Sequence, residues 1–280
     1  MSGPAGSKAV PPVSPDRTSD PGSRRSLVFQ TRNAHVDVGA GADARCILRD
    51  VSFDVRSHEF VSIMGRSGSG KTTLLKVLGG LRDATPESVV RVNGAPVDGP
   101  PEGVIFVFQD YGASLLPWRT VERNVSLGLE GRLERPQLEQ RVTEALEMVG
   151  LADRRGDHPW ELSGGMQQRV QLARSLAMRA SALLMDEPFG SLDAMTKTAL
   201  QDELQQVHRD TGATILFVTH DIDEAIYLSD RILILQGDPA TIGRDISIDL
   251  PRPRDQLATK ELPEFLALRR MVYEAITGDA

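Results

Sequence analysis

The sequence has little cysteine, no long apolar run and no excess of basic residues, and each shortage excludes a class of protein. Its one cysteine, Cys46, cannot form an internal disulfide, so a reducing, cytosolic compartment is the simplest interpretation, and a buried apolar role is favoured over a reactive thiol. No stretch reaches the run of about 20 apolar residues that spans a bilayer, which indicates a soluble or peripheral protein. A net charge of −7 and a pI near 5.3 argue against a duplex-binding protein, so we expect no nucleic-acid partner.

The beginning of the chain also has few apolar residues. Residues 1–26 are rich in Pro, Gly and Ser and do not show the basic-then-apolar pattern of a secretory signal. Because such a segment buries too little apolar surface to offset the entropy of ordering, it predicts a disordered tail. The chain of 280 residues is 40% hydrophobic overall, which is enough to bury a full core beyond this tail.

Short β-type runs alternate with helical segments after the tail. Strands are predicted at LVFQ, VSFDV, EFVSIMG, VIFVF, SALLM, ATILFVT and RILIL, and the Asn-Gly turn in VVRVNGAPVDG predicts a hairpin. Helices are predicted after a glycine-rich loop, across about 121–155, at 194–210 and 221–228, and from Pro263 onward. The alternation predicts an α/β fold with a mostly parallel sheet. We expect a core domain over 27–240, which contains a helical subdomain at about 110–178, and a C-terminal strand and helix extension over 241–280.

The glycine-rich loop follows the predicted strand EFVSIMG and opens a helix. It fits the G-x-x-x-x-G-K-[ST] pattern, in which backbone N–H groups and a helix N-terminus surround phosphate oxygens. The residues predicted to bind nucleotide are Gly65, Arg66, Ser67, Gly68, Ser69, Gly70, Lys71, Thr72 and Thr73. Lys71 is expected to reach the β- and γ-phosphates, and the Thr72 hydroxyl is expected to ligate Mg²⁺. The loop alone does not separate a kinase, a GTPase and an ATP-driven motor.

A pair of carboxylates ends another predicted strand, in SALLMDEP. Asp186 suits Mg²⁺, usually through water, and Glu187 can polarise the water that attacks the γ-phosphorus. Two adjacent acids at a strand end can also be simply solvated. Beside a phosphate loop, a role in nucleotide hydrolysis is favoured.

A second Ser-Gly-Gly stretch, LSGGMQQRV, opens a helix upstream of these acids. Ser163, Gly164 and Gly165 form a second candidate anion site. Alone, the stretch would be an ordinary helix N-cap with a glycine turn. Because it occurs in one chain with a phosphate loop and an Asp-Glu strand end, an anion site is favoured over an ordinary N-cap.

These three stretches resemble the ATP-binding subunit of ABC transporters, and the match extends from about Leu27 to Leu235. The resemblance implies a P-loop NTPase core with a mostly parallel sheet, an antiparallel β subdomain and an inserted helical subdomain. It implies ATP hydrolysis, with ATP and Mg²⁺ as cofactors. Ser163, Gly164 and Gly165 would be the signature residues at the nucleotide.

The resemblance also implies roles for individual residues. Glu187 would be the catalytic base, and Gln109 would contact Mg²⁺ and sense the γ-phosphate. His220, in VTHDIDEA, would be the switch histidine that helps to orient the attacking water, although a lone histidine at a strand end is more often structural. Asp193, in SLD, would belong to the D-loop.

In this family two subunits dimerise head to tail, so that each ATP lies between the phosphate loop of one subunit and the signature of the other. This chain has one copy of each motif, which implies a homodimer or a pair with a similar ATPase subunit. One position departs from the family. Where members usually stack an aromatic residue on adenine, this chain has Val38, and nearby His35 is a candidate substitute.

The segment DYGASLLPWRTVERNV is similar to that of importer ATPases of the nitrate, sulfonate and taurine class, and so is LPRPRD at 250–255. The resemblance implies an importer subunit at the cytoplasmic face of the membrane, bound to permease subunits and served indirectly by a solute-binding protein. The candidate docking residues, which could instead pack the helical subdomain, are Tyr111, Leu115, Leu116 and Trp118. An exporter or lipid-transport ATPase and a soluble ABC ATPase are the alternatives. The solute, whether nitrate, sulfonate, taurine or a pyrimidine, is not written in this sequence.

Overall fold

The computed structural model describes residues 26–39, 44–108, 114–190 and 192–278. In this part of the chain, ten strands form one sheet in the order β5-β4-β1-β2-β10-β9-β3-β8-β7-β6. Their bounds are β1 Leu27–Val38, β2 Arg45–Arg56, β3 Phe60–Gly65, β4 Val89–Val92, β5 Ala95–Pro96, β6 Val104–Val107, β7 Ala182–Asp186, β8 Thr214–Val218, β9 Arg231–Gly237 and β10 Ala240–Ser247. The predicted α/β class is confirmed.

One half of the sheet is parallel. Strand β3 pairs in parallel with β8 and β9, and β7 pairs in parallel with β6 and β8. The residues of β3, β7 and β8 are all buried, as expected for apolar runs that helices cover on both faces. The carboxyl ends of these strands therefore meet at one edge of the sheet.

The other half of the sheet is antiparallel. Strand β1 pairs with β2 and β4, and the Asn93-Gly94 turn joins β4 to β5 as the predicted hairpin. Both β1 and β2 have 12 residues, so the expectation of short runs at LVFQ and VSFDV was wrong. Pairing between the two strands continues past the apolar runs, through register shifts near Asn33, which has a φ of 48°. Cys46, on β2, is half-buried rather than buried.

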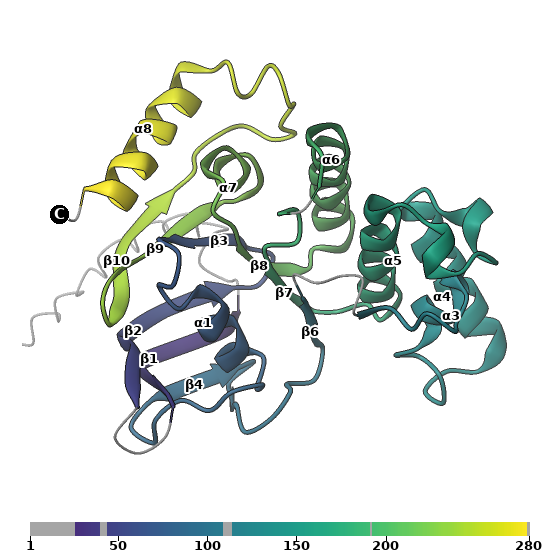
Figure 1. The fold of residues 1–280 in the computed structure, drawn as a ribbon, viewed down its shortest axis with the longest axis horizontal. Helices are drawn as coiled ribbons and strands as arrows, with labels where there is room; N and C mark the ends of the chain where they lie inside the picture. Colours follow the sequence, from purple (N-terminus) through teal and green to yellow (C-terminus); the bar gives the residue numbers. More distant parts are fainter. Residues whose placement is uncertain (1–25, 40–43, 109–113, 191, 279–280) are drawn as a thin grey trace, which may run out of the picture.

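The helices lie in two groups around the sheet (Figure 1). Helices α3 (Val121–Ser126), α4 (Arg135–Met148) and α5 (Gly164–Ala177), with the short turns η3 (Ala152–Arg154) and η4 (Pro159–Glu161), lie beside its parallel end. The other helices, which cover its faces, are α1 (Lys71–Leu78), α6 (Ala194–Thr211), α7 (Ile222–Leu228) and α8 (Pro263–Thr277). Strand β10 starts earlier than the predicted ISIDL. The domain boundaries proposed above stay a prediction.

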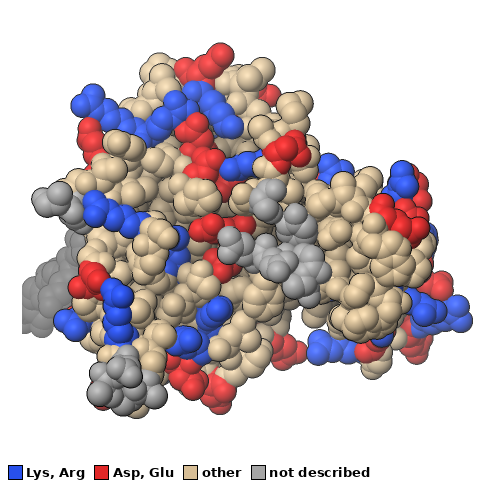
Figure 2. Space-filling model, viewed as in Figure 1, with Lys and Arg blue, Asp and Glu red and all other residues tan. Residues whose placement is uncertain are grey.

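The core divides into two clusters because side chains alternate across the sheet. On β3, Phe60 and Met64 face the cluster that includes α5, α6 and α7, while Val61 and Ile63 face the cluster that includes α1. Of the predicted N-terminal tail, residues 1–25 lie outside the described residues. In the described part of the chain, no helix combines the length and apolarity needed to cross a membrane. Basic and acidic side chains are interspersed on the face seen in Figure 2.

Candidate functional site

The glycine-rich loop connects β3 to α1 at the carboxyl edge of the parallel strands. Gly65 ends β3, and Gly70 caps α1 with a φ of 85° and no side-chain hydrogen bond to the helix. A Cβ on Gly70 would lie 2.8 Å from atoms of both Ile47 and Leu48, so this position requires glycine for space as well as for its backbone angle. The first N–H groups of α1 have no carbonyl partner within the helix, so an anion bound at the loop can accept hydrogen bonds from them.

Lys71 is folded back over the loop. Its buried ammonium donates hydrogen bonds to the carbonyl oxygens of Gly65 and Arg66, each at 3.0 Å. Burial lowers the pKa of Lys71, and the nearby carboxylates Glu187 and Asp186 oppose that shift. The arrangement keeps a cation beside the place where phosphates would lie.

Thr72 and Asp186 bring two oxygen donors together across the sheet edge. The Thr72 hydroxyl donates a hydrogen bond of 3.0 Å to Oδ1 of Asp186. Burial raises the pKa of Asp186, while this hydrogen bond lowers it. Hydroxyl and carboxylate oxygens are the donors that Mg²⁺ takes beside nucleotide phosphates, so the pair fits the predicted ion. Gln109, the other predicted ligand, lies outside the described residues.

Glu187 and His220 face each other from the ends of β7 and β8. His220 Nδ1 lies 3.2 Å from Oε2 of Glu187, and the Glu187 N–H donates to the carbonyl of Val218 at 3.0 Å. Glu187 has a φ of 44°, in the left-handed region that non-glycine residues rarely adopt. Such strain collects at functional sites, where the surrounding structure holds it in place.

Of these groups, Lys71, Thr72, Glu187 and His220 line one cavity of about 500 Å³. The residues that line it are Val38, Ile47, Ser67, Gly68, Gly70, Lys71, Thr72, Thr73, Glu187 and His220. Val38 lies where the sequence predicted an apolar contact. His35, the candidate substitute for an adenine-stacking aromatic, is not among the described lining residues. Its Nε2 instead lies 3.0 Å from Oδ1 of Asp50.

The residues predicted to form the signature lie elsewhere in the fold. Ser163 caps α5 by accepting a hydrogen bond from the Met166 N–H at 3.4 Å, and neither Gly164 nor Gly165 lines the cavity among the described residues. The helix that they open packs against α6, where Thr196 leaves no room for a Cβ on Gly165.

Asp193 similarly lies apart from the cavity lining in the described chain. It caps α6, with Oδ1 accepting hydrogen bonds from the N–H groups of Met195 and Thr196 at 3.1 and 3.0 Å. The chain by itself therefore brings together Lys71, Thr72, Asp186, Glu187 and His220, and keeps the signature and Asp193 apart from them.

The structure corrects one expectation about a side chain. Leu115 was expected at a docking surface, but it is 3% exposed and packs in the core with residues of α3 and α5. The guanidinium of Arg66 donates to the Ile276 and Thr277 carbonyls at the end of α8, at 3.3 and 3.2 Å, and the role of the Arg66 backbone at the nucleotide stays a prediction. Trp118 is 71% exposed, as docking requires.

The remaining candidate docking residues are Leu116 and Tyr111. Leu116 is half-buried, and Tyr111 lies outside the described residues.

Sequence reasoning also missed a group of charged residues between α6 and α7, behind His220. Its signal in the sequence is weak, because Lys197 and Glu224 are far apart in the chain and their pairing depends on how the two helices pack.

Residues 48–190 match the family described as ABC transporter. The chain is 44% identical over 226 residues to a nitrate import ATP-binding protein of Synechococcus elongatus, covering 79% of this chain and 34% of that protein. It is 42% identical over 236 residues to an aliphatic sulfonates import ATP-binding protein of Bacillus licheniformis, covering 84% of this chain and 89% of that protein. This chain thus spans about a third of the nitrate relative and most of the sulfonate relative.

Solved structures agree with these matches. A dimeric ATP-binding cassette in a post-hydrolysis state, bound to ADP and Pi, superposes with a TM-score of 0.68 at 32% identity, covering 79% of this chain and 98% of that one. A second dimeric structure of the same cassette superposes with a TM-score of 0.69, also at 32% identity, with the same coverage of both chains.

Proposed function

Because the chain belongs to the ABC transporter family of ATP-binding proteins, we propose that it is the ATP-hydrolysing subunit of an importer, which drives uptake of a small solute through a separate membrane permease. The observation that carries the hydrolytic part is that Lys71, Thr72, Glu187 and His220 line one cavity. Asp186 accepts a hydrogen bond from Thr72 at that site. The importer part is supported by the relatives named for nitrate and sulfonate import.

The loop and the start of α1 bind the triphosphate. Lys71 is held beside the loop by two backbone carbonyls and is placed to neutralise the β- and γ-phosphates. The N–H groups at the start of α1 add donors that need no reorganisation. Thr72 and Asp186 would hold Mg²⁺, which when bound neutralises phosphate charge.

Hydrolysis falls to Glu187 and His220. Glu187 accepts the proton of the attacking water, because its carboxylate lies at the cavity beside the place for the γ-phosphate. His220 contacts that carboxylate through Nδ1 at 3.2 Å, and we propose that its ring also lies against the γ-phosphate, so that it holds the base and the reacting group in one geometry.

We further propose that two chains complete each site. Ser163, Gly164 and Gly165 stand at the N-terminus of the 14-residue helix α5, outside the described cavity lining. If a second chain places this helix end against the γ-phosphate, the helix dipole adds attraction that is lost once the phosphate leaves. The related cassette, which is dimeric in both of its structures, supports this arrangement.

The hydrolytic assignment is tested by Glu187→Gln in the full chain. We expect ATP to bind with unchanged affinity while turnover falls by about 10²-fold or more, because only the proton acceptor is lost. Fluorescent-nucleotide titration and phosphate release measure the two quantities. Normal turnover in this variant would refute the assignment.

We propose that the permease docks near Trp118, at the cytoplasmic face of the membrane. An open cavity of about 460 Å³ lies nearby along the chain, between β6 and α5, and is lined by Phe106, Phe108 and Arg174 among others. Trp118 is itself highly exposed, and exposed tryptophans are the kind of anchor that interfaces use. Uptake measured in vesicles with the permease and its solute-binding protein distinguishes an importer from an exporter, which would move solute outward. Which solute is carried is a property of those partners.

A further inference from the structure

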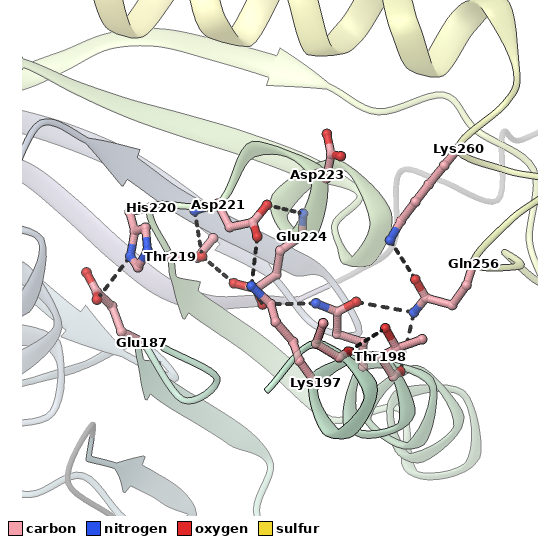
Figure 3. A network of polar contacts seen from close by, with 12 residues as sticks. Glu187, Lys197, Thr198, Thr219, His220, Asp221, Asp223, Glu224, Gln256 and Lys260 are labelled. Carbon is pink, nitrogen blue, oxygen red and sulfur yellow. Dashed lines mark hydrogen bonds and ion pairs between the residues drawn. The ribbon is translucent and has the colours of Figure 1, made fainter. Parts of the chain in front are cut away.

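A cluster of charged and polar side chains joins α6 to α7 behind the candidate catalytic pair (Figure 3). Lys197, at the end of the first turn of α6, reaches across to the start of α7. Its Nζ lies 2.7 Å from Oδ2 of Asp221 and 3.2 Å from Oε1 of Glu224. The ammonium therefore bridges two carboxylates that lie just after His220 in the chain.

Glu224 makes this cluster hard to rearrange. It is 4% exposed, and its carboxylate accepts hydrogen bonds from the Thr219 hydroxyl and, at 3.0 Å, from the side-chain amide of Gln201. Burial raises the pKa of Glu224, and Lys197 opposes that shift. Removing one partner of a buried ion pair leaves a buried charge uncompensated, so the position of Lys197 is tied to that of Glu224.

The cluster fixes both neighbours of His220. Thr219 donates to Glu224, and its hydroxyl oxygen accepts a hydrogen bond from the Asp221 N–H at 3.0 Å. Asp221 also caps α7, with Oδ1 accepting from the Glu224 N–H at 3.1 Å. The His220 side chain is itself 66% exposed and contacts Glu187, so its placement depends on the backbone that Thr219 and Asp221 hold.

The same lysine belongs to the helix that begins at the D-loop residue. Asp193 caps α6 four positions before Lys197, and the Lys197 N–H donates to the Asp193 carbonyl at 2.9 Å. A shift of the first turn of α6 is therefore transmitted to the segment that carries His220. Resting on the proposed function, we propose that Lys197 is a positioning residue, which sets His220 against Glu187 and makes that placement depend on the start of α6.

The test is a double-mutant cycle in the full chain between Lys197→Met and His220→Ala. If Lys197 acts through His220, K197M lowers kcat by about tenfold while the Kd for ATP changes by less than about twofold. In the H220A background, K197M has almost no further effect, because the side chain that it positions is gone. K197R, which keeps the charge, restores most of the rate.

A matched control removes a comparable ion pair elsewhere. Glu59 pairs with Arg231 at 2.9 Å at the other end of the parallel strands, with side chains that are mostly buried. Glu59→Gln should leave kcat within about twofold of the unchanged protein and should not couple to H220A. Urea unfolding of each variant separates loss of fold from loss of positioning.

A second measurement keeps the inference testable where residual rates are small. The structure of K197M should show the 3.2 Å contact between His220 and Glu187 lost, while K197R and E59Q keep it. Equal losses from K197M with and without His220, or an intact contact in K197M, would overturn the positioning role. Absence of ATP hydrolysis by the unchanged protein would instead refute the proposed function.

Discussion

Two glycines of the phosphate loop have similar backbone angles but differ in the space around an added Cβ. Gly68 and Gly70 have φ values of 80° and 85°, so replacing either by alanine forces a Cβ into the left-handed region. That strain costs about 1–2 kcal/mol at each position. Alanine also stiffens the unfolded chain, but it does so equally in both variants.

The surroundings of the added methyl group differ. At Gly68 no atom lies within 4 Å of the added Cβ, whereas at Gly70 side-chain carbons of Ile47 and Leu48 lie 2.8 Å away. Overpacking of this kind costs about 1–3 kcal/mol. Gly70→Ala should therefore destabilise the nucleotide-free protein by about 1–3 kcal/mol more than Gly68→Ala does.

Urea unfolding of the two variants and the unchanged protein measures the difference. The slope of the unfolding free energy against urea should be the same for all three, so that the midpoints report stability alone. Equal losses from G68A and G70A would show that the packing of Ile47 and Leu48 against this loop is not what excludes a side chain. A larger loss from G68A would refute the reasoning outright.

Three further predictions concern charge and docking. Asp186→Asn should stabilise the nucleotide-free protein by about 0.5–2 kcal/mol in urea unfolding, because burial disfavours the charged form of this carboxyl and raises its pKa. The same variant should lose ATP turnover. A loss of stability would contradict the prediction. Arg32 lowers the pKa of Asp54 through its hydrogen bonds, so the stability contributed by Asp54 is present above its unfolded pKa and is lost as the pH falls through the lower folded value. The stability difference between the unchanged protein and Asp54→Asn should be constant above about pH 5 and should shrink as the pH falls through 3.8, the ordinary pKa of the carboxyl, and below it. Trp118→Ala should uncouple ATPase activity from a co-expressed permease without changing ATP affinity. The control Leu257→Ala removes a side chain that is 75% exposed and should leave the two activities coupled. Unchanged co-purification of W118A with the permease would contradict docking at this surface.

Local chemistry explains which parts of the site could be predicted. The phosphate loop is recognisable because its glycines and Lys71 act within one strand-loop-helix unit. The Asp186–Glu187 pair is recognisable because it ends a fully apolar strand. Placement at a shared edge follows from the parallel pairing of β3, β8 and β7. The roles assigned to these residues stay predictions.

What could not be predicted depends on contacts between distant segments. The full length of β1 and β2 comes from their mutual pairing, which carries polar residues into the sheet. Burial of Leu115 depends on how α3 and α5 meet, which no local pattern specifies. Arg66 donates to the carbonyls of Ile276 and Thr277 at the end of α8, more than 200 residues away in the chain.

The central claim is that ATP joins two chains, each of which supplies half of a site. The most direct test measures the mass of Glu187→Gln in solution, with and without ATP, by size-exclusion chromatography with light scattering. We expect ATP to convert the 30.5 kDa chain into a species of twice that mass, and we expect Ser163→Arg in the same background to prevent it by blocking the end of α5. Saturating ATP binding by E187Q at the single-chain mass would contradict the claim.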